Sequence, residues 1–283
     1  MLIVKSVNEL KEQVGVLRKA HKTIGFVPTM GALHKGHLQL VSRCVAENDV
    51  CVVSLFVNPT QFNDKNDFNC YPRTLDKDAA LLESVGCSIV FAPSADDMYA
   101  PEEINNVFAF DFGGLDQTME GVFRPGHFNG VVQVVSKLFK IATPDKAYFG
   151  EKDFQQLAII RRMVRVMNFP IQIVGCPIVR ETSGLALSSR NALLSEEERT
   201  TATFIYKTLS KSVALQSGKT IAEVKTWVTN TLNATEGLRV EYFEIVDGNS
   251  LKSLTDWSES EYVVGCITVY CGKVRLIDNI RYK

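Results

Sequence analysis

The chain has 283 residues, of which 46% are hydrophobic and 22% are charged, and its formal net charge is −1. Such a length and hydrophobic content suffice for one large or two medium globular domains. The balanced charge excludes a bulk attraction to nucleic acid or to an anionic membrane surface. We therefore expect neither as a partner, and any affinity for anions must be local.

The N-terminal residues and the cysteines bear on where the protein works. Lys5 and Glu9 introduce charge too early for the apolar core of a signal peptide, and no apolar run approaches about 20 residues. The chain has 7 cysteines, which lie mostly within apolar runs and include no Cys-x-x-Cys pair. We therefore expect reduced thiols and a cytoplasmic protein.

Short apolar runs alternate with amphipathic helical patterns through the first part of the chain. Strands are expected at residues 24–27, 50–57, 88–91, 147–149 and 171–174, and helices at 36–47, 75–84, 128–141 and 154–166. Short strands separated by helices are typical of a parallel sheet. We predict a Rossmann-like, doubly wound α/β domain over residues 1–176, with its ligand crevice at the carboxyl ends of the strands.

The pattern changes after Cys176. Following a polar loop, helices are expected to begin at Ser195 and Thr220, and strands lie near residues 240–246, 262–270 and 274–277. Ser195 with Glu198 is a capping-box signature, which fixes a helix start there. Helices followed by strands indicate a second, smaller α+β domain over residues 177–283.

Residues 26–37 lie where the strand at 24–27 turns into the helix at 36–47, and they read Phe-Val-Pro-Thr-Met-Gly-Ala-Leu-His-Lys-Gly-His. Backbone N–H groups and the positive end of the helix dipole gather at such a turn. Gly31 and Gly36 keep Cβ atoms away from an approaching phosphate. The pattern predicts an anion site beside His34 and His37. The His-x-x-His spacing also suits two zinc ligands, but no cysteine or acidic cluster accompanies it.

Two polar segments are expected beside this turn. Asn58 and Gln61 follow the strand at 50–57 and suit a ligand with hydroxyl and carboxylate groups, although Asn-Pro at this position also builds an ordinary turn. Arg124 and His127 precede a strongly apolar helix, so they form another cationic helix start.

Two further segments carry cationic side chains. Lys152 follows the strand at 147–149 and offers a point charge for phosphate, and Asp153 could cap the next helix or hold ribose or magnesium. The loop at 180–191 contains Ser188, Ser189 and Arg190 in succession at the expected domain junction. This loop could close over a bound triphosphate, or it could simply be a solvated loop.

Together these segments resemble the pantothenate synthetase family, also called the pantoate–β-alanine ligases, over nearly the whole chain. The shared motifs are Pro-Thr-Met-Gly-Ala-Leu-His-x-Gly-His at 28–37, Phe-Val-Asn-Pro-x-Gln-Phe at 56–62, Arg-Pro-Gly-His-Phe at 124–128, Gly-Glu-Lys-Asp at 150–153 and Ser-Ser-Arg-Asn at 188–191. The resemblance implies the nucleotide-binding fold that is shared with nucleotidylyltransferases. Ser183 and Ala192 depart from the usual Asp and Tyr, and we expect altered loop contacts there without a change in chemistry.

The resemblance implies an activity and its small-molecule partners. The family condenses pantoate with β-alanine using ATP, passes through a pantoyl adenylate, and releases pyrophosphate and AMP. Magnesium and a homodimer are implied as well, but no magnesium ligand is assigned, since Lys77 separates the nearby Asp76 and Asp78. Three arginines on the helix at 154–166 could face a second subunit or solvent: Arg161, Arg162 and Arg165.

The resemblance also implies which residues form the site. ATP is expected to bind Met30, Gly31, Ala32, Leu33, His34, Lys35, Gly36, His37, Gly150, Glu151, Lys152, Asp153, Val179, Leu187, Ser188, Ser189 and Arg190. The catalytic residues are expected to be His37 as proton donor, His34 beside the phosphates, Lys152 as a neutralising charge, Ser188, Ser189 and Arg190. Pantoate is expected on Gln61 and Gln156 with support from Asn58, and Gln61 also faces β-alanine. Arg124 and His127 receive no role.

Two rival functions share part of this pattern. A nucleotidylyltransferase of the same superfamily would keep the His-x-Gly-His site but transfer a nucleotidyl group to a phosphorylated acceptor. Such an acceptor requires extra basic side chains, whereas Gln61 and Gln156 are neutral. A catalytically inactive nucleotide-binding protein is disfavoured because every charged position of the matched motifs is intact.

Overall fold

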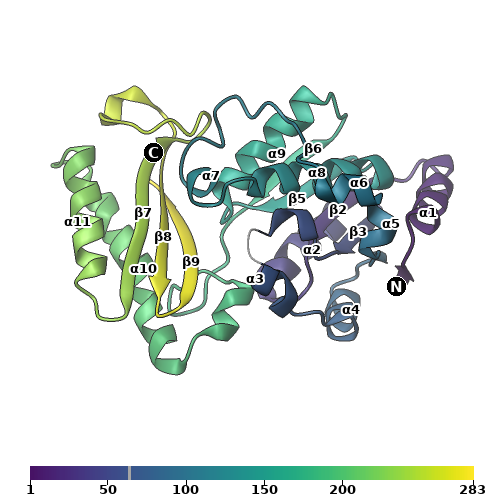
Figure 1. The fold of residues 1–283 in the computed structure, drawn as a ribbon, viewed down its shortest axis with the longest axis horizontal. Coiled ribbons are helices and arrows are strands. Elements are labelled where there is room, and N and C mark those ends of the chain that lie inside the picture. Colours follow the sequence, from purple (N-terminus) through teal and green to yellow (C-terminus); the bar gives the residue numbers. More distant parts are fainter. Residues whose placement is uncertain (63–64) are drawn as a thin grey trace. The chain divides into compact units, whose positions relative to one another are not determined.

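The computed structural model describes residues 1–62 and 65–283, and the chain forms two compact units (Figure 1). The first unit comprises Met1–Asp116, Gly121–Glu151 and Gln156–Cys176, and the second comprises Gln117–Glu120, Lys152–Gln155 and Pro177–Lys283. Two short segments that precede residue 177 in the chain therefore pack with the second unit.

A six-stranded sheet forms the centre of the first unit. Its strands are β1 (Leu2–Val4), β2 (Ile24–Thr29), β3 (Val50–Leu55), β4 (Ile89–Phe91), β5 (Lys146–Gly150) and β6 (Gln172–Cys176). They lie in the order β1-β4-β3-β2-β5-β6, and the neighbouring strands are parallel. The predicted parallel sheet is confirmed, and the structure adds β1, which pairs with β4.

Helices cover both faces of this sheet. The long helices of the first unit are α1 (Val7–Lys19), α2 (Lys35–Glu47), α4 (Leu75–Ser84), α8 (His127–Ala142) and α9 (Phe154–Val166). Val27 of β2 shares a core cluster with Val41 of α2 and Leu82 of α4. The preceding residue, Phe26, points to the other face and meets Phe139 of α8 edge to face at 6.3 Å. The predicted doubly wound α/β arrangement is therefore confirmed.

The strand order reverses between β2 and β5. These strands are neighbours, with Gly25 opposite Lys146, and β3 follows β2 on one side whereas β6 follows β5 on the other. In open α/β sheets, ligands bind at such a switch point, outside the carboxyl ends of the strands. Thr29 ends β2 and Gly150 ends β5, so both motifs that follow these strands start at the switch point.

Several elements of the first unit were not predicted. Helix α1 begins with a capping box, in which Ser6 Oγ accepts the N–H of Glu9 at 3.2 Å and Glu9 accepts the N–H of Ser6 at 3.1 Å. Short helical segments also occur at η1 (Pro59–Gln61), α3 (Lys65–Cys70), α5 (Ala95–Met98), α6 (Pro101–Asn105) and α7 (Glu120–Phe123). Single turns of this kind lack the apolar periodicity that marks a long helix.

The second unit contains a three-stranded antiparallel sheet that is covered by two helices (Figure 1). Its elements are η2 (Ser189–Leu193), α10 (Glu196–Leu215), α11 (Ile221–Asn233), β7 (Leu238–Asp247), η3 (Trp257–Glu259), β8 (Val263–Cys271) and β9 (Val274–Arg281). Leu209 of α10, Val228 of α11 and Ile267 of β8 share one buried apolar cluster. The predicted smaller α+β fold is confirmed, and Ser195 caps α10 as the capping box predicts.

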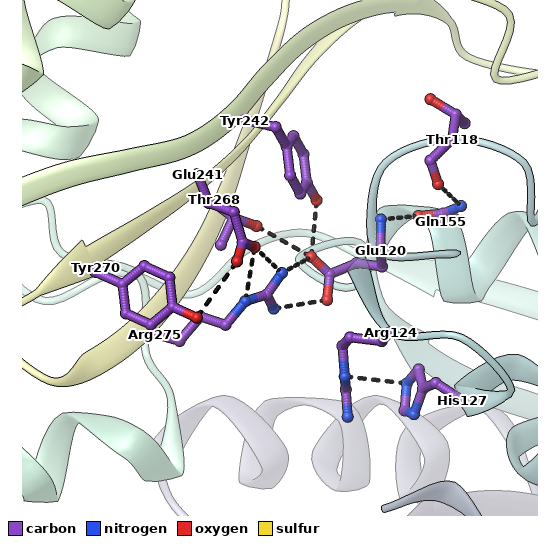
Figure 2. A network of polar contacts seen from close by, with 10 residues as sticks. All are labelled: Thr118, Glu120, Arg124, His127, Gln155, Glu241, Tyr242, Thr268, Tyr270 and Arg275. Carbon is purple, nitrogen blue, oxygen red and sulfur yellow. Dashed lines mark hydrogen bonds and ion pairs between the residues drawn. The ribbon is translucent and has the colours of Figure 1, made fainter. Parts of the chain in front are cut away.

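A β-bulge makes the other face of this sheet polar. The pairing of β7 with β8 shifts between Val240 and Tyr242, and a bulge turns two consecutive side chains to one side. Val240 and Phe243 both pack with the helix-covered core, so Glu241 and Tyr242 lie on the opposite face. There Arg275 of β9 places its Nε 2.9 Å from Glu241 Oε2 (Figure 2).

The cysteines are free thiols, and Cys70 is exposed whereas the other six are buried. Their burial agrees with the apolar residues that flank them in the sequence. Across residues 1–62 and 65–283, no helix has both the length and the hydrophobicity that crossing a bilayer demands.

Candidate active site

A buried carboxylate shapes the turn between β2 and α2. Asp78 of α4 is 1% exposed, and its oxygens accept the N–H groups of Ala32 at 2.9 Å and of Leu33 at 2.8 Å. Gly31 and Ala32 have positive φ angles of 81° and 50°, and this conformation is unfavourable for a residue with a Cβ atom. The two charge-assisted bonds stabilise the strained turn. Asp78 therefore sets the path of the backbone that is predicted to bind ATP.

The two histidines of the motif stack at the start of α2. Their ring centroids are 4.0 Å apart. His34 Nδ1 accepts the N–H of Gly36 at 3.1 Å, and His37 Nδ1 accepts the N–H of His34 at 3.4 Å. A ring nitrogen that accepts a hydrogen bond carries no proton, so these bonds assign the Nε2–H tautomer to both imidazoles. Two N–H donors at a helix N-terminus suit an anionic phosphate.

The other side chains of this segment have different surroundings. Leu33 is 7% exposed and packs in the core beneath the turn, so its backbone is the part suited to a nucleotide. Lys35 is exposed. Met30 is half-buried, and its Sδ lies 3.0 Å from Nε2 of Gln61. The turn that is predicted to bind ATP thus touches the residue that is predicted to bind pantoate.

Asn58 holds the turn that presents Gln61. It is 1% exposed, and its Nδ2 donates to Gln61 Oε1 and to the carbonyl of Gly130, both at 3.1 Å. Its Oδ1 accepts the hydroxyl of Tyr99 at 2.9 Å. Burial raises the pKa of Tyr99, so the phenol remains a donor. Because its amide is engaged within the protein, Asn58 supports Gln61.

Arg124 and His127 support the same turn from the start of α8. Arg124 Nη1 lies 3.1 Å from His127 Nε2 (Figure 2), and His127 Nδ1 lies 2.8 Å from the carbonyl oxygen of Gln61. A guanidinium only donates and a carbonyl only accepts, so the ring proton is on Nδ1. The structure thereby gives these residues the role that the sequence left open: they fix the backbone of Gln61.

The consecutive glutamines after β5 have different environments. Gln155 is 4% exposed, and its Oε1 accepts the N–H of Glu120 at 2.9 Å while its Nε2 donates to the carbonyl of Thr118 at 2.8 Å (Figure 2). Gln156 is half-buried. Gln155 is therefore a structural residue, and Gln156 keeps the exposure that a ligand-binding residue needs.

The motif after β5 is divided between the two units. Gly150 and Glu151 belong to the first unit, whereas Lys152 and Asp153 belong to the second. Lys152 is half-buried, Asp153 is exposed, and the carbonyl of Lys152 accepts a hydrogen bond from Asn279 Nδ2 at 3.0 Å. The residues that are predicted to bind the nucleotide thus belong to both units.

The junction loop of the second unit is a short hairpin that ends in a 3₁₀ turn. The N–H of Leu187 donates to the carbonyl of Val179 at 2.9 Å and closes the hairpin. Ser188 is the N-cap of η2, and its Oγ accepts the N–H of Arg190 at 3.3 Å. Ser188, Ser189 and Arg190 are therefore brought together at the start of one helical turn.

A buried ion pair anchors the base of this hairpin. Arg180 donates to both carboxylate oxygens of Asp278, at 2.7 and 2.8 Å, and Asp278 is 5% exposed. The guanidinium carbon lies 3.7 Å from the ring centroid of Tyr206 in α10. At the hairpin tip, Ser183 Oγ accepts the N–H of Leu185 at 3.4 Å, so the hydroxyl closes the turn.

The described residues do not offer a metal site. Within ranges 1–62 and 65–283, no three or more His, Cys, Asp and Glu side chains are arranged to hold a metal ion. The carboxylate of Asp78 binds backbone N–H groups and also accepts the hydroxyl of Thr74 at 3.1 Å. The zinc alternative for His34 and His37 therefore finds no third ligand in this part of the chain.

Sequence reasoning missed three residues that support the predicted site. Asp78 was considered only as an uncertain metal ligand, and Tyr99 and Asn279 were not singled out. Each lies far along the chain from its partner, so no local pattern reveals the contact. The available signals were an acidic residue that falls on the apolar side of helix 75–84 and a polar pair, Asp278-Asn279, within an apolar strand.

Comparisons with known proteins establish the family of this chain. The family model described as pantoate-beta-alanine ligase matches residues 2–281. The pantothenate synthetase of Phocaeicola vulgatus is 59% identical over 284 residues, with 100% of each chain covered. The crystal structure of the Thermus thermophilus pantothenate synthetase has a TM-score of 0.91 and 42% identity, covering 100% of this chain and 99% of that one.

A ligand-bound structure also matches. The pantoate-beta-alanine ligase of Francisella tularensis, complexed with beta-gamma ATP and beta-alanine, has a TM-score of 0.84 and 36% identity, and the match covers 100% of this chain and 98% of that one. Family model, sequence relatives and solved structures all extend over essentially the full length. This chain therefore belongs to the pantoate–β-alanine ligase family.

Proposed function

We propose that this enzyme joins pantoate to β-alanine with ATP, through a pantoyl adenylate. In the first step a carboxylate oxygen of pantoate attacks the α-phosphorus of ATP, and the bond to the pyrophosphate oxygen breaks. In the second step the amine of β-alanine attacks the acyl carbon, the C–N bond forms, AMP leaves and the nitrogen loses a proton. The substrate carboxylate is the first nucleophile, so this chemistry needs none from the protein.

The contact between Met30 and Gln61 carries this proposal. It joins the turn that is predicted to bind ATP to the amide that is predicted to bind pantoate, with 3.0 Å between Sδ and Nε2. Adenylate formation requires a carboxylate and an α-phosphate to be held side by side, and such positioning lowers the barrier. The ligands named for the Francisella tularensis structure support ATP and β-alanine as substrates.

The cationic and donor groups have complementary roles in this scheme. His34 and His37 donate hydrogen bonds from their Nε2–H groups to phosphate oxygens, and the bond from His37, the predicted proton donor, disperses the charge on the departing pyrophosphate. Lys152 neutralises the charge that develops on the phosphates. Fixed donors aimed at developing charge are each worth about 3 kcal/mol of transition-state stabilisation. Ser188, Ser189 and Arg190 are the remaining catalytic and ATP-binding residues of this proposal.

Four further properties belong to the proposal. Magnesium enters as part of the ATP substrate, held by phosphate oxygens, since the described residues do not fit a dedicated magnesium cage. The family resemblance supports a homodimer and a cytoplasmic location. Residues 177–283 are assigned the role of a lid domain.

ATP–pyrophosphate exchange tests the proposed reaction. We expect labelled pyrophosphate to enter ATP only when pantoate is present, because the reversal of adenylate formation needs the pantoyl group. Adding β-alanine should then release AMP with pantothenate. Exchange that is indifferent to pantoate, or that requires a phosphorylated acceptor, would overturn the ligase assignment and favour a nucleotidylyltransferase.

A further inference from the structure

Strand β9 presents two consecutive polar residues to opposite faces of its sheet. Asp278 binds Arg180 on the face that α10 covers. Asn279 lies on the other face, where its Nδ2 donates to the carbonyl of Lys152 at 3.0 Å. Asn279 is 8% exposed, and a buried amide keeps its hydrogen bonds because losing one is costly. The donor is therefore held in a fixed direction toward Lys152.

A second anchor lies three residues farther along. Gln155 binds the backbone of Thr118 and of Glu120 through its two amide atoms (Figure 2). The ring of Phe154 packs against that of Tyr262, with centroids 6.0 Å apart. The segment 152–155 is therefore held at both of its ends by residues of the second unit.

The segment that Gln155 binds, residues 117–120, is itself fixed to the three-stranded sheet through Glu120. Arg275 donates two hydrogen bonds of 2.7 Å to the carboxylate of Glu120, and Tyr242 donates a third at 2.8 Å (Figure 2). Burial, with the charge of Glu120 second, raises the pKa of Tyr242, so its hydroxyl remains a donor. Thr268 adds a bond of 3.0 Å. These four hydrogen bonds, from residues of β7, β8 and β9, fix Glu120. The N–H of Glu120 in turn donates to Gln155.

We propose that Asn279 is a positioning residue for Lys152, so that the lysine is aimed by the C-terminal sheet. This inference rests on the proposed role of Lys152 in adenylate formation. The strand that leads to the lysine, β5, ends at Gly150 in the first unit. Beyond that strand end, Asn279 binds the carbonyl of Lys152, and Gln155 binds the backbone of Thr118 and Glu120.

A double-mutant cycle tests the proposal. The variants are Asn279→Leu, which removes the donor and keeps the branched shape of the side chain, Lys152→Ala and the combination of both. Single-turnover adenylate formation is measured at saturating ATP and pantoate. We expect Asn279→Leu to slow this step about tenfold, since a small misplacement of a catalytic group has effects of this order. The KM for ATP should change less than about twofold, because the lost interaction belongs to the transition state.

The combination separates positioning from general damage. If Asn279 acts through Lys152, adding Asn279→Leu to Lys152→Ala should slow adenylate formation by less than about twofold more. Loss of a further tenfold in the double variant would overturn the proposal, because the effect would then not pass through the lysine. A normal rate in Asn279→Leu would overturn it as well, even where Lys152→Ala is slow.

Two controls keep the outcome interpretable. Gln133 in α8 is 5% exposed, and its Nε2 donates to the carbonyl of Glu103 at 2.8 Å. Gln133→Met therefore removes a matched buried amide in the first unit, and we expect it to leave the adenylation rate unchanged; an equal loss would overturn the proposal. Asn279→Ala replaces Asn279→Leu if the latter does not fold. Unchanged adenylation in Lys152→Ala would instead remove the lysine from the proposed mechanism, while pantoate-dependent exchange would still support the ligase activity.

Discussion

Asp78 is a buried side chain that shapes a turn far from it in the sequence, the turn after β2 that is predicted to bind ATP. It accepts two consecutive N–H groups, from Ala32 and Leu33, and bridges α4 to the turn after β2. The bonds are formed to a charged group, and they hold Ala32 at a φ of 50°. The direction of the following backbone, up to the stacked histidines, depends on this carboxylate.

Replacing Asp78 by Asn should loosen that turn. The amide can accept one N–H but directs its own NH₂ group at the other, so a buried donor loses its partner. We expect the free energy of unfolding to fall by about 1–3 kcal/mol and the KM for ATP to rise more than the KM for pantoate. Denaturant titration and steady-state kinetics measure the two effects. Asp76→Asn, at an exposed position of the same helix, is the matched control, and equal effects in both variants would contradict the argument.

At the scale of single residues, the sequence revealed the motifs but not the distant residues that hold them in place. The hydrogen bonds that fix the tautomers of His34 and His37 join residues within the motif itself, at the start of α2. They are therefore local in sequence. The bond from Asp78 to Ala32 spans 46 positions, and only the folded chain brings them together. Arg124 and His127 were recognised as a motif, but their role depends on a contact with the backbone of Gln61.

Helix α8 approaches the turn at Pro59–Gln61 so closely that only glycine fits at the contact. A Cβ atom on Gly130 would lie 2.3 Å from the carbonyl oxygen of Thr60 and 2.7 Å from Cα of Gln61. The same glycine accepts the Asn58 bond through its carbonyl. Packing between these two elements therefore sets where Gln61 stands.

Gly130→Ala should displace the η1 turn. We expect the KM for pantoate to rise at least about tenfold, since moving Gln61 by a fraction of an ångström misplaces its amide, while the KM for ATP changes less. Steady-state kinetics measures the two KM values, and isothermal titration measures the accompanying rise in the Kd for pantoate. Gly15→Ala, in helix α1 where nothing lies within 4 Å of the added Cβ, is the control and should bind pantoate normally. Unchanged pantoate affinity in Gly130→Ala would contradict the argument, because the η1 turn would then accommodate the added methyl group without misplacing Gln61.

Predicted elements were most accurate where apolar periodicity was long. The bounds of α4 and α9 agree with the expected helices, α2 begins one residue earlier, and α8 is one residue longer at each end. Strand β1 and helix α1 were missed because three strand residues and a mostly polar helix give a weak pattern. The bulge in β7 could not be predicted, since it is defined by the pairing of β7 with β8, a tertiary contact.

On the scale of the whole molecule, the proposed adenylate needs protection from water. A loop that closes over bound ligands would provide it, and the hairpin that carries Ser188 to Arg190 is the expected loop. We predict that ATP plus pantoate slows tryptic cleavage after Arg190 at least about fivefold, as binding to the closed form stabilises it. Mass spectrometry of the fragments follows the cut, and cleavage after Lys219, in the exposed turn between α10 and α11, serves as the internal reference. Equal cleavage with and without ligands would count against closure.

The sequence predicted a division after Cys176 but could not reveal the two earlier segments of the second unit. Segments 117–120 and 152–155 join it through Glu120, Gln155 and the backbone of Lys152. None of these contacts has a local signature, because a buried glutamate and a solvated one look alike in a sequence. Their burial is a property of the tertiary fold.

The discontinuous second unit limits how this protein can be recombined. Residues 177–283 contain Arg275 and one of its two carboxylate partners, Glu241. The other partner, Glu120, is encoded far upstream. A C-terminal gene fragment transferred between relatives would therefore bring its arginine without the matching glutamate segment. A chimera that keeps these contacts has to exchange three stretches of the gene together, because the second unit is continuous in space and not in sequence.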